Sequence, residues 1–198
     1  MMRYPIRPVV ALVTLLPLAA CISFGGKPPR TLMTLTTAAP LPVNETSNSS
    51  KSPTITIQVP SVPQALASAR VPVQTGATSI AYVKDAFWAE PPARLFARLL
   101  SDTIASKTGR VVLSGAQAFG DPGAKLAGEL RSFGIDEASS EAVVQYEAVI
   151  ARGPGRVYEK RRFEAREPIS TVSADTVGPA INRAANKVAA DVADWVGR

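Results

Sequence analysis

The amino-acid sequence predicts an α+β domain in which an antiparallel or mixed β-sheet carries two main amphipathic helices on one face. Short segments with alternating apolar residues recur from residue 54 onward, as in half-buried strands. Two other stretches, 91–109 and 173–196, repeat their apolar residues at spacings of three and four. Each helix therefore has an apolar stripe that a sheet must cover, and 198 residues suffice for one such domain.

The first twenty residues have the pattern of a secretory signal peptide. Arg3 and Arg7 precede a 12-residue apolar run over 9–20, which ends in small residues directly before Cys21. The run is shorter than the about 20 residues that a membrane-spanning helix needs, and Pro17 interrupts it. We therefore expect residues 1–20 to be removed.

The tetrapeptide Leu18-Ala19-Ala20-Cys21 resembles the lipobox of bacterial lipoproteins. The resemblance implies cleavage before Cys21 and acylation of its sulfur and new amino group, so that acyl chains anchor the protein to a membrane. Ile22 stands where an aspartate keeps many lipoproteins at the inner membrane, which favours the outer membrane, facing the periplasm. An ordinary signal peptide that happens to end beside a cysteine is the alternative.

Residues 21–53 are expected to form the acylated N-terminus and a flexible tether. Ten of the 17 prolines fall within the first 63 residues, and the segment 37–53 has low apolar content. Within the tether, residues 31–36 alternate threonine with apolar side chains, which predicts one short strand. The domain itself is expected to span 54–198.

The first half of this domain contains strand signals followed by a helix. Residues 54–59 alternate with period two, which places Ile55, Ile57 and Val59 on one strand face. Residues 71–73 and 80–83 are expected to pair as a hairpin around 76. A helix follows Trp88, with prolines in its first turn and Gly109 as its C-terminal cap.

The second half predicts further strands and a long final helix. Residues 111–113 are expected to form a buried strand, 125–135 a longer one, and 141–151 with 156–168 a hairpin around 153–155. The final helix begins near Ser173. Its core-facing stripe is spaced 4, 3, 4, 4 and 3 residues apart and comprises Val177, Ile181, Ala184, Val188, Val192 and Trp195.

The composition excludes most common catalytic systems. The chain has no histidine and one cysteine, which excludes Ser-His-Asp and Cys-His nucleophile systems and internal disulfides. No glycine-rich loop ends in Gly-Lys-Ser/Thr, so we expect no nucleotide, metal or cofactor and no enzymatic activity. Asp85 and Glu90 leave a hydrolase cleft as an alternative, although a loop that leads into a helix explains both carboxylates.

The basic charge of the chain does not indicate a nucleic-acid partner. The chain has 22 basic and 16 acidic side chains, but Arg3 and Arg7 belong to the signal peptide. The densest basic run, 160–162, is interleaved with Glu159 and Glu164 in an expected strand. This pattern is typical of a solvated sheet face.

Aromatic residues before the first helix are the candidate partner contacts. Tyr82, Phe87 and Trp88 lie close together in a segment rich in chain reversals, and aromatic anchors are enriched in protein interfaces. The competing interpretation is that Trp88 closes one end of the core over the helix.

Several segments together resemble the PqiC-like family of ABC-type transport auxiliary lipoproteins. These segments are the lipobox, TLMTL at 31–35, IQVP at 57–60, RVPV at 70–73, YVKDAFWAEPP at 82–92 before LF and LL at 95–100, LAGEL at 126–130 and FGID at 133–136. The resemblance spans nearly all of the chain after Cys21.

The resemblance implies a non-catalytic envelope component that acts with an ABC permease and ATPase and with an MCE-domain protein. Such systems move phospholipids or other hydrophobic molecules between membranes. We expect this protein to dock onto the MCE component through the surface around 82–92, and we leave open whether it forms a homo-oligomer. The alternative function is an envelope lipoprotein adaptor that activates or organises a cell-wall synthesis complex.

Overall fold

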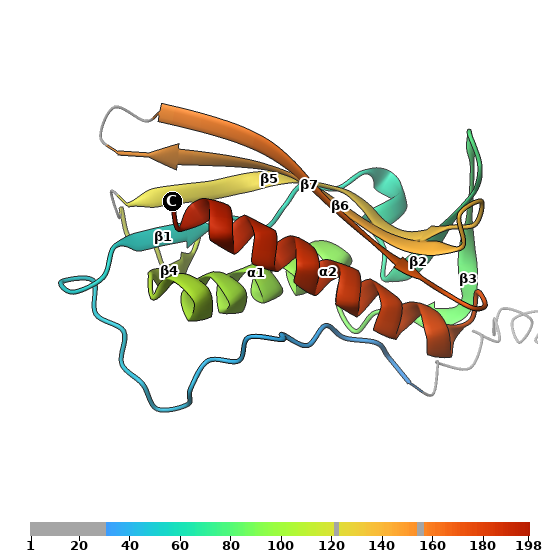
Figure 1. Ribbon diagram of the computed structural model, residues 1–198, viewed down its shortest axis with the longest axis horizontal. Coiled ribbons are helices and arrows are strands. Elements are labelled where there is room, and N and C mark those ends of the chain that lie inside the picture. Colours follow the sequence, from blue (N-terminus) through green and yellow to red (C-terminus); the bar gives the residue numbers. More distant parts are fainter. Residues whose placement is uncertain (1–30, 121–122, 154–156) are drawn as a thin grey trace, which may run out of the picture.

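The computed structural model describes residues 31–120, 123–153 and 157–198 (Figure 1). Cys21 and the expected signal peptide lie outside these residues, as do parts of the two turns expected near 121–123 and 153–155. In chain order the elements are β1 (Thr54–Ile57), the 3-10 helix η3 (Gln64–Leu66), β2 (Arg70–Gly76), β3 (Ser79–Phe87), α1 (Pro92–Thr108), β4 (Val111–Ser114), β5 (Ala124–Asp136), β6 (Glu141–Arg152), β7 (Val157–Pro168) and α2 (Ala174–Val196).

One mixed seven-stranded sheet is organised around β5. One edge of β5 pairs antiparallel with β6, which in turn pairs antiparallel with β7. The other edge changes partner along its length, because residues 124–126 pair parallel with β1 and residues 135–136 pair parallel with β2. β4 extends the sheet beyond β1, and β3 extends it beyond β2.

Both helices cover the same face of this sheet, which confirms the expected α+β class (Figure 1). α1 ends where Gly109 adopts the left-handed conformation (φ 66°), as its sequence predicts. α2 begins with a capping box between Ser173 and Thr176. The opposite face of the sheet carries no α-helix among the described residues, and we call it the helix-free face.

The core lies between the helices and the sheet. The ring of Phe96 from α1 meets that of Tyr146 from β6, with centroids 5.3 Å apart, and burial raises the pKa of the Tyr146 hydroxyl well above its ordinary value. The entire predicted stripe of α2 is buried: Val177, Ile181, Ala184, Val188, Val192 and Trp195. None of the described helices is long and apolar enough to cross a membrane.

Two expectations about strands were wrong. Val59 does not share a buried face with Ile55 and Ile57, because β1 ends at Ile57 and Val59 is 57% exposed. The strand at 111–113 is half-buried rather than buried, because β4 pairs only with β1 among the described strands and so lies at an edge of the sheet.

The segment before β1 is attached to the domain at its start. Met33 forms a single β-bridge to Trp88, in place of the short strand expected over 31–36. Its amide donates to the Phe87 carbonyl at 2.8 Å, and its carbonyl accepts from the Ala89 amide at 2.8 Å. From there the chain runs along the helices toward the opposite end of the molecule (Figure 1).

Two asparagines on α2 hold the next residues of this segment. The amides of Thr36 and Ala38 donate to the side-chain oxygens of Asn182 and Asn186, at 2.9 and 2.7 Å. Asn186 also donates to the Thr36 carbonyl at 2.9 Å. Residues 33–38 are therefore part of the folded body, although the sequence places them in the tether.

Candidate partner-binding surface

Trp88 belongs to the core and not to the surface. Its side chain is 1% exposed, and its ring centroid lies 5.3 Å from that of Phe133. The interpretation of Trp88 as an exposed partner contact is therefore wrong, and the competing interpretation, that it closes the core, holds. The physical reason is the left-handed backbone at Asp85 (φ 57°), which changes the alternation of β3 shortly before Trp88.

Tyr82 and Phe87 are half-buried, so their proposed role as contacts stays a prediction. The Arg70 guanidinium lies 4.0 Å from the centroid of the Tyr82 ring, a cation–π contact. The Tyr82 hydroxyl donates to the Ala65 carbonyl at 3.4 Å and thereby joins β3 to η3. Tyr82 thus supports η3, which forms part of one wall of a groove.

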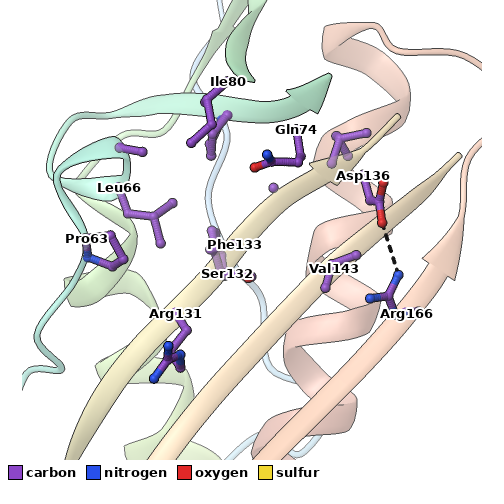
Figure 2. Close-up of a pocket in the computed structure, with 14 residues that line it drawn as sticks. Pro63, Leu66, Gln74, Ile80, Arg131, Ser132, Phe133, Asp136, Val143 and Arg166 are labelled. Atoms are coloured by element: carbon purple, nitrogen blue, oxygen red, sulfur yellow. Dashed lines mark hydrogen bonds and ion pairs between the residues drawn. The ribbon is translucent and has the colours of Figure 1, made fainter. Parts of the chain in front are cut away.

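A groove of about 220 Å³ lies on the helix-free face of the sheet, across β5; we name it the β5 groove. Figure 2 shows Arg131 near one end and Ile80 and Gln74 near the other, with the helices behind the strands. One wall comes from η3 and the β2–β3 hairpin, and the other from β5, β6 and β7. The lining includes Pro63, Leu66, Pro72, Ile80, Arg131, Val143 and Arg166.

The groove exists because β5 changes partner at this point. The pairing of β5 with β6 is interrupted by a register shift between Leu130 and Ser132, which makes Arg131 an extra residue of the strand. Before the shift, residues 124–126 of β5 pair with β1, and the segment 58–61 continues beside β5 as far as Leu130. After the shift, residues 135–136 of β5 pair with β2. The shift also changes which residues face the helices, from Leu130 to Phe133.

The two arginines of the groove differ in how they are paired. Arg166 contacts three carboxylates, at 3.3 Å from Asp136, 3.2 Å from Glu141 and 2.7 Å from Glu164. These hydrogen bonds raise the pKa of its guanidinium above the ordinary value, with that from Glu164 contributing most. The guanidinium of Arg166 is therefore already bound by carboxylates of its own chain.

Arg131 has no such close partner. Its guanidinium lies 3.8 Å from the nearest carboxylate oxygens, those of Glu129 and Glu147, which is beyond hydrogen-bond distance. Glu147 is engaged elsewhere, since Lys160 contacts it at 2.6 Å and Arg162 at 2.8 Å. Their hydrogen bonds lower the pKa of the Glu147 carboxyl to about 2. The side chain of Arg131 is 42% exposed, so its donors are accessible to a ligand.

Asp85 and Glu90 are the two carboxylates on which the alternative interpretation as a hydrolase depends. Glu90 forms an ion pair with Arg98 of α1 at 2.7 Å, which stabilises the start of that helix. Asp85 is exposed on β3. Among the described residues, no group of three or more Cys, Asp or Glu side chains is placed to hold a metal ion.

A larger depression, of about 930 Å³, lies between the loop 40–52 and the α1–β4 end of the domain. Hydroxyl, amide and charged side chains make up most of its lining, including Ser101, Asp102, Arg110 and Gln117. Burial raises the pKa of Asp102 despite the nearby charge of Arg98. Its polar lining does not suit acyl chains.

The sequence analysis did not single out Arg131, which lines the groove, or Asn182 and Asn186, which hold residues 36–38. The sequence does contain a signal for Arg131. The large apolar residues that are buried in this segment stand at even-numbered positions up to Leu130 and at odd-numbered positions from Phe133 onward. Such a change indicates an extra residue between them. The asparagines at 182 and 186 share one helix face through their four-residue spacing, which was the available signal for them.

Comparison with solved structures supports the fold. The chain is similar to protein XCC0632 from Xanthomonas campestris, of the DUF330 family, with a TM-score of 0.64 and 20% identity over 85% of this chain and 92% of that one. It is also similar to a crystal structure titled only as an uncharacterized protein, with a TM-score of 0.60 and 16% identity over 74% of this chain and 90% of that one. No curated protein matches the chain significantly.

A family model decides the classification. The model for the ABC-type transport auxiliary lipoprotein component matches residues 34–193. The match covers all the strands, α1 and all but the last three residues of α2, and it begins inside the segment that Met33, Asn182 and Asn186 attach to the body. The chain belongs to the family of ABC-type transport auxiliary lipoprotein components.

Proposed function

We propose that this protein is a non-catalytic, lipid-anchored component of an ABC transport system that moves phospholipids or other hydrophobic molecules across the cell envelope. In this proposal it docks onto the MCE component of the system and sits at the outer membrane, facing the periplasm. The observation that carries the proposal is the family match over 34–193, which covers nearly all of the described body.

The place where the chain enters the fold supports an anchored arrangement. Cys21 is the proposed acylation site, and among the residues from 31 onward Met33 is the first whose backbone is hydrogen-bonded to the domain. The intervening residues 22–32 reach at most about 40 Å when extended. Acyl chains on Cys21 would hold the domain within this distance of a bilayer and raise its effective concentration for a partner there.

The helix-free face of the sheet supports docking rather than cargo carriage. A lipid tail exposed to water costs about 0.8 kcal/mol per CH₂, so a transport bridge needs an enclosed path. The β5 groove, at about 220 Å³, is smaller than ordinary small-molecule sites of about 300–1,000 Å³. Its size suits a single side chain of a partner protein, and the MCE component is the partner that we propose.

Isolation of the assembled complex tests this function. Full-length protein carrying a C-terminal tag, expressed in its native bacterium and crosslinked in cells, should be isolated with an MCE-domain protein and an ABC permease or ATPase. The Cys21→Ser variant should lose most of this association, because it is not held at the membrane. Recovery of a cell-wall synthase without transport components would contradict the proposal and favour the adaptor function.

A further inference from the structure

We propose that the β5 groove binds an extended peptide segment of a partner protein in which an apolar side chain lies beside a carboxylate, with Arg131 binding that carboxylate. The inference names the recognition chemistry of the docking surface proposed above and therefore rests on that function. The apolar side chain would lie between Leu66 and Ile80.

The apolar half of the groove is open to a ligand. Ile80 is 51% exposed at the β2–β3 hairpin, whereas Leu66 and Val143 of the same lining are only 2% and 8% exposed. An incoming side chain would therefore cover exposed Ile80 and meet a fixed apolar floor. The volume of about 220 Å³ accommodates one leucine-sized or phenylalanine-sized side chain and excludes a folded element.

The charged end of the groove determines which residue of the partner peptide lies beside the apolar side chain. Arg131 offers a guanidinium whose nearest carboxylates are 3.8 Å away, and a guanidinium binds carboxylates through two parallel hydrogen bonds. Arg166, the other groove arginine, is already bound by three carboxylates. Charge complementarity therefore favours one carboxylate close to Arg131.

The chain's own N-terminal segment does not have this chemistry. Residues 22–30 contain Ile22 and Phe24, but their charged side chains are Lys27 and Arg30, and no acidic residue is present. Like charge would repel these cations from Arg131. An acyl chain lacks the carboxylate beside an apolar group that the geometry favours. A partner peptide is therefore the occupant to which the observations point.

Selection from a random-peptide phage library tests this inference without the partner itself. The full-length acylated protein, immobilised in detergent, should enrich peptides that carry Asp or Glu within two residues of Leu, Ile, Met or Phe. Arg131→Gln should weaken a selected peptide about tenfold or more, the effect of losing a charge-assisted hydrogen bond. Arg131→Glu should reverse the preference to peptides with Lys or Arg.

Two further variants separate recognition from folding. Ile80→Asp should abolish selection of apolar residues. Arg94→Glu, at an exposed position of α1, changes the charge as much as Arg131→Glu does and should leave selection unchanged. If wild type and Arg131→Glu enriched the same peptides, the inference would be overturned. Peptide binding that appears only after deletion of residues 22–30 would also overturn it, because the chain's own segment would then occupy the groove. Neither result affects isolation of the transport complex, which tests the proposed function separately.

Discussion

Gly128 lies in the middle of β5, where no side chain fits. A Cβ atom built there would lie 2.3 Å from the Glu147 carbonyl oxygen and 2.7 Å from the Tyr146 ring. Tyr146 is fully buried and packs against Phe96, so neither the ring nor the neighbouring backbone can move freely. The glycine permits the close approach of β6 that brings Tyr146 into the core.

The variant Gly128→Ala should therefore be strongly destabilising. Overpacking against a fixed ring and backbone typically costs about 1–3 kcal/mol. Urea unfolding followed by circular dichroism would measure the change. Gly115→Ala is the matched control, because a Cβ there meets nothing within 4 Å. Equal midpoints for both variants would contradict the packing described for β5 and β6.

The ion pairs of Glu147 predict a specific pH dependence. Hydrogen bonds from Lys160 and Arg162 hold its pKa at about 2, below the ordinary value of 4.5. Because the folded-state pKa is lowered, the stabilisation is complete above about pH 4.5 and is lost as pH falls toward 2. The difference in unfolding free energy between wild type and Glu147→Gln should shrink across this range.

Urea titrations between pH 3 and 7 measure this difference. Glu137→Gln, a substitution at an exposed turn position, controls for the general loss of a carboxylate. A difference between wild type and Glu147→Gln that stays constant from pH 7 to 3 would show that the Lys160 and Arg162 contacts do not stabilise the folded state.

Among the elements, α2 joins the segment before β1 to the rest of the fold. Its apolar stripe covers the sheet, and its asparagines bind residues 36–38. On another face of α2, Arg183 and Lys187 contact the carboxylate of Glu167 from β7, and their hydrogen bonds lower its pKa. One helix therefore connects the N-terminal segment, the edge strand and the core.

The double variant Asn182→Ala, Asn186→Ala should release residues 36–38 without unfolding the domain. Hydrogen exchange measured by NMR should show the Thr36 and Ala38 amides exchanging about tenfold or more faster, because each loses its acceptor. Asp191→Ala, at an exposed position of the same helix, should leave both amides protected. Unchanged protection in the double variant would show that other contacts hold this segment.

Local patterns in the sequence predicted the helices and most strands. The spacing of the apolar residues and the capping residues, such as Gly109 and Ser173, predict both helices. The parallel pairing of β5 with β1 and β2 has no local signal, because it joins segments distant in sequence. The β5 groove could not be predicted for the same reason, since it arises where β5 exchanges one parallel partner for the other. Trp88 was ambiguous because an aromatic side chain suits a core and an interface equally well.

On the scale of the whole molecule, the proposed anchor at Cys21 precedes the end of the domain at which the described chain begins. The described chain begins at Thr31, beside the start of α2, and the C-terminus lies at the opposite end of the domain (Figure 1). If Cys21 is acylated, Cys21→Ser should move the protein from the membrane fraction to the soluble periplasmic fraction, as measured by carbonate-washed fractionation. Retention of the serine variant in the membrane fraction would contradict the anchor.

Site-specific photocrosslinking in cells tests the central claim most directly, namely that the helix-free sheet face of the anchored domain contacts the transport partner. A photoreactive amino acid at position 80, in the β5 groove, should capture an MCE-domain protein. The same amino acid at position 94, an exposed position of α1, should not. Capture of the MCE protein from position 94 alone, or of no transport component from either position, would contradict the account.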